Sequence, residues 1–182
     1  MEKIDQSAAE ALKWLRFVLY PETEMPIVTN WGALYGFAEK QKISGICSPS
    51  PYSVKIELSL LFQWLGIEQE IRKRSVVLNE HVKELCQLLE DAEFHCCILK
   101  GQGNAEMYPD SLLRMPGDID VWIDADKETI QKYVRERFPE AVESYKHIKF
   151  PMFDDVPVDV HVTPLKFYCP KYHKFFQLRF LN

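Results

Sequence analysis

The chain has 182 residues, of which 47% are hydrophobic and 27% are charged, and its 27 acidic and 22 basic residues give a formal net charge of −5. This composition is typical of a globular protein and excludes a disordered or collagen-like chain. No apolar run approaches the roughly 18 residues of a membrane span, and the first residues lack the apolar core of a signal peptide. The acidic balance argues against a protein that binds nucleic acid mainly through a basic surface.

The cysteines do not have the spacing of a disulfide framework or of a structural zinc site. There are five of them, two are adjacent, and none forms a Cys-x-x-Cys pair. They are Cys47, Cys86, Cys96, Cys97 and Cys169. We therefore expect buried or free thiols and a cytoplasmic, reducing environment.

The first half of the chain has the periodicity of amphipathic helices. A first helix is predicted to start near Ser7, which forms a capping-box pattern with Glu10. The face expected to be buried consists of Ala8, Leu12, Leu15 and Leu19. A second helix is predicted to begin near Thr29 or Asn30 and to end at Gly45. Its expected inner face consists of Trp31, Leu34, Tyr35 and Ala38.

A loop is predicted at residues 48–51, where two prolines lie close together. From Ser53 to Leu89 the apolar residues again repeat at three- and four-residue steps. This pattern fits two helices or one long helix weakened near Gly66 or Ser75. We interpret its aromatic and leucine stripes as packing surface rather than as a cofactor site.

The periodicity changes after Phe94, where strands are expected. Residues 96–99 form a continuous apolar run, which predicts a central strand covered on both faces. Residues 118–123 largely alternate between polar and apolar types, which predicts a strand with one polar face. The other expected elements are a short helical stretch before Tyr108, a helix over 126–138 with Ile130, Val134 and Phe138 inward, strands over 145–150 and 156–162, and a helical stretch over 172–181.

These elements predict an α+β protein: a small mixed β-sheet core with helices, preceded by a helical N-terminal module. We expect the helical module to cover residues 1–92 and the α/β core to cover residues 93–165. Residues 166–182 are predicted to form a C-terminal helical tail that is truncated.

Three carboxylates and an imidazole lie at strand positions that share a face. Residues two apart in a strand point the same way, so Asp118 and Asp120 form one pair, and Asp159 and His161 form another. If the two strands are neighbours, all four side chains converge. Repulsion between the acids is most simply relieved by a bound cation. Clustered carboxylates suit magnesium, with manganese as an alternative, and two such ions can catalyse phosphoryl transfer.

Groups suited to phosphate binding lie just before these carboxylates. Gly101 and Gly103 form a turn in which backbone amides can approach an anion, and Lys100 and Arg114 add positive charge. For Arg114, an ion pair with Glu106 or Asp110 is an equally good interpretation. For His161, a role in orienting Asp159 is favoured over a role as general base.

The order of these motifs resembles the nucleotidyltransferase superfamily with the DNA polymerase β-type fold. More narrowly, it resembles an uncharacterised bacterial nucleotidyltransferase family. The motifs occupy about residues 95–163, and the helical first half, including residues 31–41, is also similar to that family. They read Lys100-Gly101-Gln102-Gly103, Tyr108-Pro109, Arg114, Gly117-Asp118-Ile119-Asp120 and Val158-Asp159-Val160-His161.

The resemblance implies a role for each motif. Asp118 and Asp120 are the Asp-x-Asp pair that binds both metals, Asp159 is the third acid, and Gly101 holds the nucleotide phosphates. Gln102 departs from the Gly or Ser usual at its position. The implied reaction transfers a nucleoside monophosphate from a nucleoside triphosphate such as ATP to an acceptor hydroxyl.

The acceptor is left open between a small molecule, a sugar, a protein and a nucleic acid, and so is the oligomeric state. Two alternatives keep the fold without the reaction. One is a catalytically silent nucleotide- or metal-binding module, and the other is an antitoxin-like protein whose helical half binds a partner.

Overall fold

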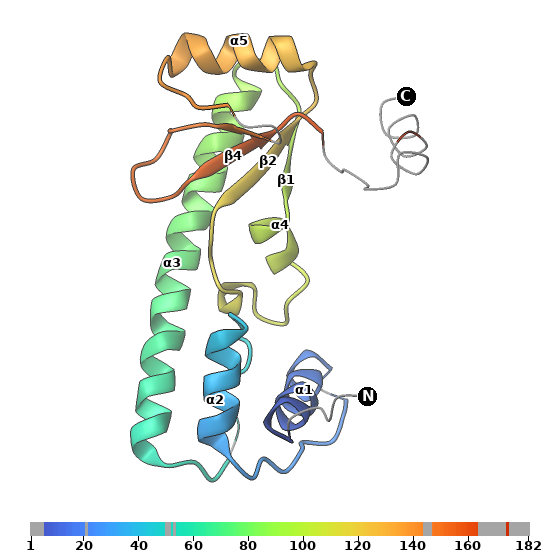
Figure 1. Ribbon diagram of the computed structural model, residues 1–182, viewed down its shortest axis with the longest axis vertical. Coiled ribbons are helices and arrows are strands. Elements are labelled where there is room, and N and C mark those ends of the chain that lie inside the picture. Colours follow the sequence, from blue (N-terminus) through green and yellow to red (C-terminus); the bar gives the residue numbers. More distant parts are fainter. Residues whose placement is uncertain are drawn as a thin grey trace. The chain divides into compact units, whose positions relative to one another are not determined.

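The structure, a computed structural model, describes residues 6–20, 22–49, 52, 54–143, 147–163 and 174. These residues form five α-helices, one short 3₁₀ helix and one mixed sheet of four strands, and three of the helices precede the first strand (Figure 1). This confirms the predicted α+β class. The chain divides into two compact units, one drawn from residues 1–83 and 100–117 and the other from 84–99 and 118–182. The three-part division at residues 92 and 165 remains a prediction.

The first helix of the first unit, α1 (Gln6–Leu19), buries part of the predicted face, because Leu15 and Leu19 are partly buried and pack against the core. Its buried residues are Ala11, Trp14 and Val18, whereas Leu12 is 53% exposed. The prediction was wrong for Leu12, because it followed the leucine spacing, whereas Trp14 offers both a larger apolar surface and an indole N–H that donates to the Cys47 carbonyl at 2.9 Å.

The start of α1 is tied to the segment before the second helix. The Glu10 carboxylate accepts hydrogen bonds from the backbone N–H of Thr29 at 3.0 Å and from its hydroxyl at 2.6 Å. The side chain of Ser7 lies outside the described residues, so the capping box stays a prediction.

Helix α2 (Trp31–Lys40) begins where the sequence predicts. Asn30 is its N-cap, and the Asn30 side chain accepts from the Ala33 N–H at 2.9 Å. The predicted end at Gly45 is wrong: α2 ends at Lys40, and Lys42, two residues later, has a positive φ of 59° that a helix cannot continue through. Gly45 is needed for space instead: a Cβ there would lie 2.1 Å from the Leu113 carbonyl oxygen.

Aromatic side chains fill the core of the first unit. Trp14 and Trp31 pack edge to face with ring centroids 4.9 Å apart, and Tyr35 and Trp64 do so at 5.1 Å. The Trp64 N–H donates to the Ser44 carbonyl at 2.8 Å. Each buried indole therefore keeps its polar group satisfied while its ring is removed from water.

Helix α3 (Leu58–Glu90) is a single helix of 33 residues, which decides between the two alternatives left open by the sequence. Gly66 and Ser75 lie inside it without interrupting it. Its residues up to Lys83 belong to the first unit and the rest to the second. It contributes the buried side chains of Trp64, Ile71, Leu78, Leu85 and Leu89.

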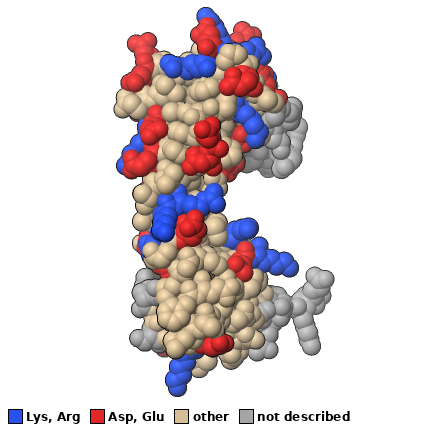
Figure 2. Space-filling model, turned by 90° about the vertical axis from the view of Figure 1, so that its left-hand side faces the viewer, with Lys and Arg blue, Asp and Glu red and all other residues tan. Residues whose placement is uncertain are grey.

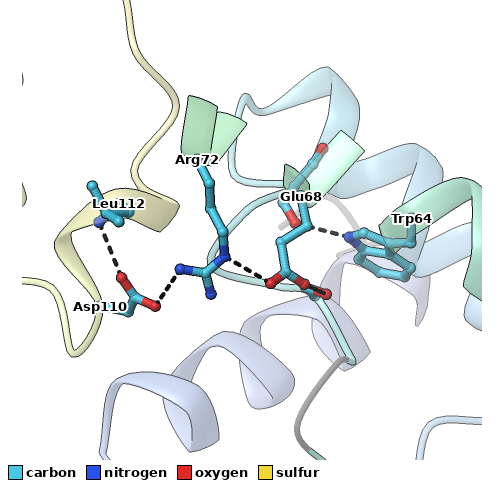
Figure 3. A network of polar contacts seen from close by, with 7 residues as sticks. Trp64, Glu68, Arg72, Asp110 and Leu112 are labelled. Carbon is cyan, nitrogen blue, oxygen red and sulfur yellow. Dashed lines mark hydrogen bonds and ion pairs between the residues drawn. The ribbon is translucent and has the colours of Figure 1, made fainter. Parts of the chain in front are cut away.

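A buried carboxylate on α3 is at the centre of a polar network (Figure 3). Glu68 is only 4% exposed and accepts from the Ser48 hydroxyl at 2.6 Å and from Arg72 Nε at 3.0 Å. Arg72 Nη1 also donates to Asp110 Oδ2 at 2.7 Å. Asp110 in turn caps the 3₁₀ helix η1 (Ser111–Leu113), so the network joins α3 to this short helix.

The second unit is built on a sheet with the order β1-β2-β4-β3. Its strands are β1 (Cys96–Leu99), β2 (Ile119–Ile123), β3 (His147–Lys149) and β4 (Val158–His161). The inner pair β2–β4 is parallel, and both outer pairs are antiparallel. The prediction that residues 96–99 form a central strand is wrong: β1 is an edge strand, and Cys97 is exposed.

Helix α5 (Lys127–Arg137) begins at the N-cap Asp126 and buries Ile130 and Val134, as predicted. Phe138 ends the helix, and its ring packs edge to face on Phe150 at 4.7 Å. Most of the predicted C-terminal helical stretch, 172–181, lies outside the described residues.

The surface carries charges of both signs. On the face drawn in Figure 2, Lys and Arg side chains are interspersed with Asp and Glu side chains, without one continuous basic surface. None of the helices in the described part of the chain combines the length and hydropathy needed to cross a membrane.

Candidate metal centre

The parallel pair β2–β4 brings the predicted carboxylates together. Asp120 is paired in register with Asp159, and the flanking valines 121 and 160 are paired beside them. Asp118 lies two residues before Asp120 and therefore on the same side. One oxygen from each of the three carboxylates lies within 4.8 Å of the other two.

Two of the three carboxylates are nearly buried. Asp120 is 6% exposed and Asp159 is 9% exposed, while Asp118 faces solvent. At separations near 5 Å and an effective dielectric constant of about 20, two carboxylates repel by about 3 kcal/mol. The alternation of apolar residues along the strands explains why the three carboxylates point to the same side of the sheet. It does not explain why these positions are acidic, since the acids repel one another.

Each buried carboxylate has an imidazole beside it. His161 Nε2 lies 2.6 Å from Asp120 Oδ1, and His147 Nε2 lies 3.5 Å from Asp159 Oδ2. The expectation that His161 orients Asp159 is wrong. Two residues along one strand are about 6.5 Å apart, whereas a diagonal neighbour on the adjacent strand is within reach of a long side chain. His161 therefore contacts Asp120 on β2.

Sequence reasoning missed His147 and Lys149, which also approach Asp159 from β3. Lys149 Nζ lies 3.9 Å from Asp159 Oδ1, and Lys149 is paired with Asp159 in register. The signal was present in the alternation of the His-Ile-Lys segment, where only Ile148 is buried. This alternation shows which side chains of β3 share a face, but they could be assigned to Asp159 only once β3 was known to pair with β4.

The donor set fits a hard divalent cation. Asp159 Oδ1 is buried and has no hydrogen-bond partner in the described structure, an arrangement that is costly unless another ligand satisfies the oxygen. Oxygens on opposite sides of one magnesium ion lie about 4 Å apart, so small side-chain rotations would let the three carboxylates share an ion. The three carboxylates could therefore hold a divalent metal.

The predicted phosphate-binding residues belong to the first unit. Lys100, with φ of 48°, precedes the short helix α4 (Gly101–Ala105), so the predicted turn passes directly into a helix. Gly101 is buried and Gly103 is exposed. Gln102, the departure from the family pattern, is mostly buried and donates from its side-chain amide to Asn79 on α3. This contact gives Gln102 a role in packing.

Arg114 does not form the ion pair with Glu106 or Asp110 that the sequence left open as an alternative to phosphate contact. Asp110 pairs with Arg72 instead, and Arg114 has no ion pair in the described part of the chain. Its Nη1 donates to the Met115 carbonyl at 3.0 Å, and its own carbonyl accepts from the Ser75 hydroxyl at 3.4 Å. Arg114 is thus held by backbone contacts, with its charge uncompensated by a carboxylate.

Comparison with known families agrees with the class that the sheet and its carboxylates indicate. A family model described as an uncharacterised nucleotidyltransferase matches residues 28–180. Because the match covers most of the chain, this protein belongs to that family, and the predicted resemblance is confirmed. No curated protein and no solved structure matches the chain.

Proposed function

We propose that this protein is a metal-dependent nucleotidyltransferase that moves a nucleoside monophosphate from a nucleoside triphosphate to an acceptor hydroxyl and releases pyrophosphate. The observation that carries the proposal is the cluster of Asp118, Asp120 and Asp159, whose carboxylate oxygens lie within 4.8 Å of one another. Membership in a nucleotidyltransferase family supports it independently.

In this proposal Asp118 and Asp120 would hold two magnesium ions, for which manganese could substitute, and Asp159 would complete the ligand set. Bound magnesium would neutralise charge on the phosphates and favour ionisation of the attacking hydroxyl. The buried Oδ1 of Asp159 has no hydrogen-bond partner in the described structure and only a long ion pair, of 3.9 Å, with Lys149, which supports its role as a ligand. His161, 2.6 Å from Asp120, would hold that carboxylate in its ligating orientation.

The bond changes proposed for the reaction involve little covalent chemistry by the protein. The acceptor oxygen forms a bond to the α-phosphorus, the bond from this phosphorus to the β-phosphate oxygen breaks, and pyrophosphate leaves. Asp159 receives the hydroxyl proton and passes it to solvent. Catalysis would rest on positioning and charge neutralisation.

We further propose that Lys100, Gly101, Gly103 and Arg114 contact the nucleotide phosphates. This assignment rests on the order of the family motifs, since these residues and the carboxylates belong to different units. The uncompensated charge of Arg114 is consistent with it.

The test is transfer of label from an α-labelled nucleotide, starting with ATP, to a panel of small-molecule, sugar, protein and nucleic-acid acceptors with magnesium. Replacing Asp118, Asp120 or Asp159 individually by Asn should lower the rate at least about a hundredfold, because each change removes a ligand charge. Asp124→Asn is the matched control, since Asp124 is exposed and lies outside the cluster. An Asp118→Asn protein as active as wild type would reject the proposal.

Two other outcomes have distinct signatures. Calorimetry that detects metal-dependent nucleotide binding without label transfer would indicate a silent binding module. A stable complex with another protein, detected by size measurement and co-purification, would instead indicate an antitoxin-like role for the helical half.

A further inference from the structure

The first unit contains an open pocket lined by positive charge. Its volume is about 600 Å³, and its lining includes Lys42, Arg74, Arg114, Gln41 and Tyr108, with no acidic residue among the described residues that line it. A volume in this range is typical of sites for small molecules. The concentration of three cations is notable in a chain whose formal charge is −5.

The three cations have no carboxylate partner among the residues that the structure describes. In the described structure, neither Lys42 nor Arg74 nor Arg114 has an ion pair within 4.0 Å. Arg72 of the same unit, by contrast, is neutralised by Glu68 and Asp110. Like charges gathered around one pocket repel each other, and a bound anion would relieve that repulsion.

Hydrogen bonds to the backbone fix the segments that carry the three cations. Ser75, the residue after Arg74 on α3, is fully buried and donates to the Arg114 carbonyl, which ties the two arginine-bearing segments together. Lys42 occupies the left-handed turn that ends α2. The Lys42 N–H donates to the Glu39 carbonyl at 3.1 Å, and the Ile43 N–H donates to the Ala38 carbonyl at 2.9 Å. These two carbonyls at the end of the helix are therefore already satisfied.

We propose that this pocket is a binding site for the phosphate groups of a small phosphorylated molecule, with Lys42 and Arg74 acting together with Arg114. Guanidinium groups bind phosphate oxygens through paired N–H donors, and the lysine ammonium adds a further charge. The phosphate could be carried by the nucleoside triphosphate or by a phosphorylated acceptor. The site goes beyond the proposed reaction, because it binds phosphate whether or not transfer occurs.

Binding of inorganic tripolyphosphate, measured by calorimetry at physiological ionic strength with EDTA, tests this site. The wild type should bind one tripolyphosphate. Arg74→Gln should weaken binding at least about threefold, and the double variant Lys42→Gln/Arg74→Gln at least about tenfold, as expected for losing one or two charged contacts. Lys73→Gln is the matched control, because it makes the same charge change at the neighbouring exposed position of α3, outside the pocket lining.

Absence of binding to the wild type, or equal weakening by Lys73→Gln and Arg74→Gln, would overturn the proposal. Because Arg74 is exposed, its single variant is expected to fold even if the double variant does not. Competition by ATP would identify a nucleotide as the phosphate source, competition by ribose 5-phosphate alone would identify a phosphorylated acceptor, and competition by neither would overturn the site.

The test also separates this site from the proposed transferase activity. Asp120→Asn should keep tripolyphosphate binding, since Asp120 does not line the pocket. Intact binding with no label transfer by the wild type would count against the transferase alone. Intact transfer with no tripolyphosphate binding would count against the pocket alone.

Discussion

Asp120 and Asp159 lie directly opposite each other in the parallel pair β2–β4, and each has an imidazole from a different position in the sheet beside it. His161 on β4 contacts the carboxylate of β2, and His147 on β3 contacts the carboxylate of β4. The contacts thus cross from strand to strand. Sheet register, rather than position along one strand, decides which histidine supports which acid.

Removing the closer imidazole should weaken metal binding. His161→Ala is expected to lower the affinity for manganese about 10–100-fold, the usual effect of losing a hydrogen-bond partner of a metal ligand. His147→Ala should have a smaller effect, because its contact is 3.5 Å rather than 2.6 Å. Calorimetric titration with manganese measures both, and His95→Ala at an exposed position is the control. Equal affinities in all three variants would contradict the assigned role of His161.

The two carboxylate partners of Arg72 are expected to contribute unequally to the stability of the protein. In Arg72→Met, the Glu68 carboxylate loses its cationic partner but stays buried, since its side chain is only 6% exposed. The free energy of unfolding should therefore fall by about 3 kcal/mol. Asp110 is the more exposed of the two carboxylates that pair with Arg72, and in Asp110→Asn the side-chain oxygen can still accept from the Leu112 N–H. The free energy of unfolding should therefore fall by at most about 1 kcal/mol.

Urea denaturation of these two variants and the wild type provides the measurement. If Arg72→Met costs no more than Asp110→Asn, then the Arg72–Glu68 contact in Figure 3 does not compensate a buried charge.

The side of the sheet on which the carboxylates lie could be predicted, because successive side chains of a strand point to opposite faces. Ile119 and Val121 required a buried face on one strand, and Val158 and Val160 required one on the other. Once both faces were assigned, the acids between these residues had to point the other way. Pairing of the two strands then brought the acids together, as register confirms for Asp120 and Asp159.

Other features depend on contacts that periodicity does not contain. The apolar run at 96–99 was compatible with a central strand, but among the described strands β1 pairs only with β2 and so lies at an edge. In α1, leucine spacing could not reveal that the Trp14 indole has an acceptor at the Cys47 carbonyl. Lys42 lines the positively charged pocket together with Arg74 and Arg114, which lie more than 30 residues away in the sequence.

Two glycines of the first unit should respond in opposite ways to alanine. Gly45→Ala places a Cβ 2.1 Å from the Leu113 carbonyl oxygen. Because the backbone must move to relieve this clash, the free energy of unfolding should fall by about 1–3 kcal/mol or more. Gly66→Ala meets nothing within 4 Å inside α3 and should stabilise by about 0.5–1 kcal/mol through helix propensity. Chemical denaturation compares the two, and a neutral Gly45→Ala would show that the close approach is absent.

The buried thiol of Cys47 should make stability depend on pH in the alkaline range. Burial raises the pKa of Cys47 from 9.0 to about 12. The folded protein therefore keeps this proton where the unfolded chain loses it. The resulting stabilisation is complete below pH 9 and is lost as pH rises towards 12, by up to about 1.4 kcal/mol per pH unit.

Comparison with Cys47→Ala isolates this effect from other groups that titrate at high pH. The variant loses the buried sulfur at every pH, so its deficit in unfolding free energy should be constant below about pH 8. Between pH 9 and 11 the wild type should lose stability more steeply than the variant, and the difference between them should shrink. Denaturation midpoints measured across this range provide the test. A difference that stays constant up to pH 11 would show that the thiol ionises equally well in the folded and unfolded chains.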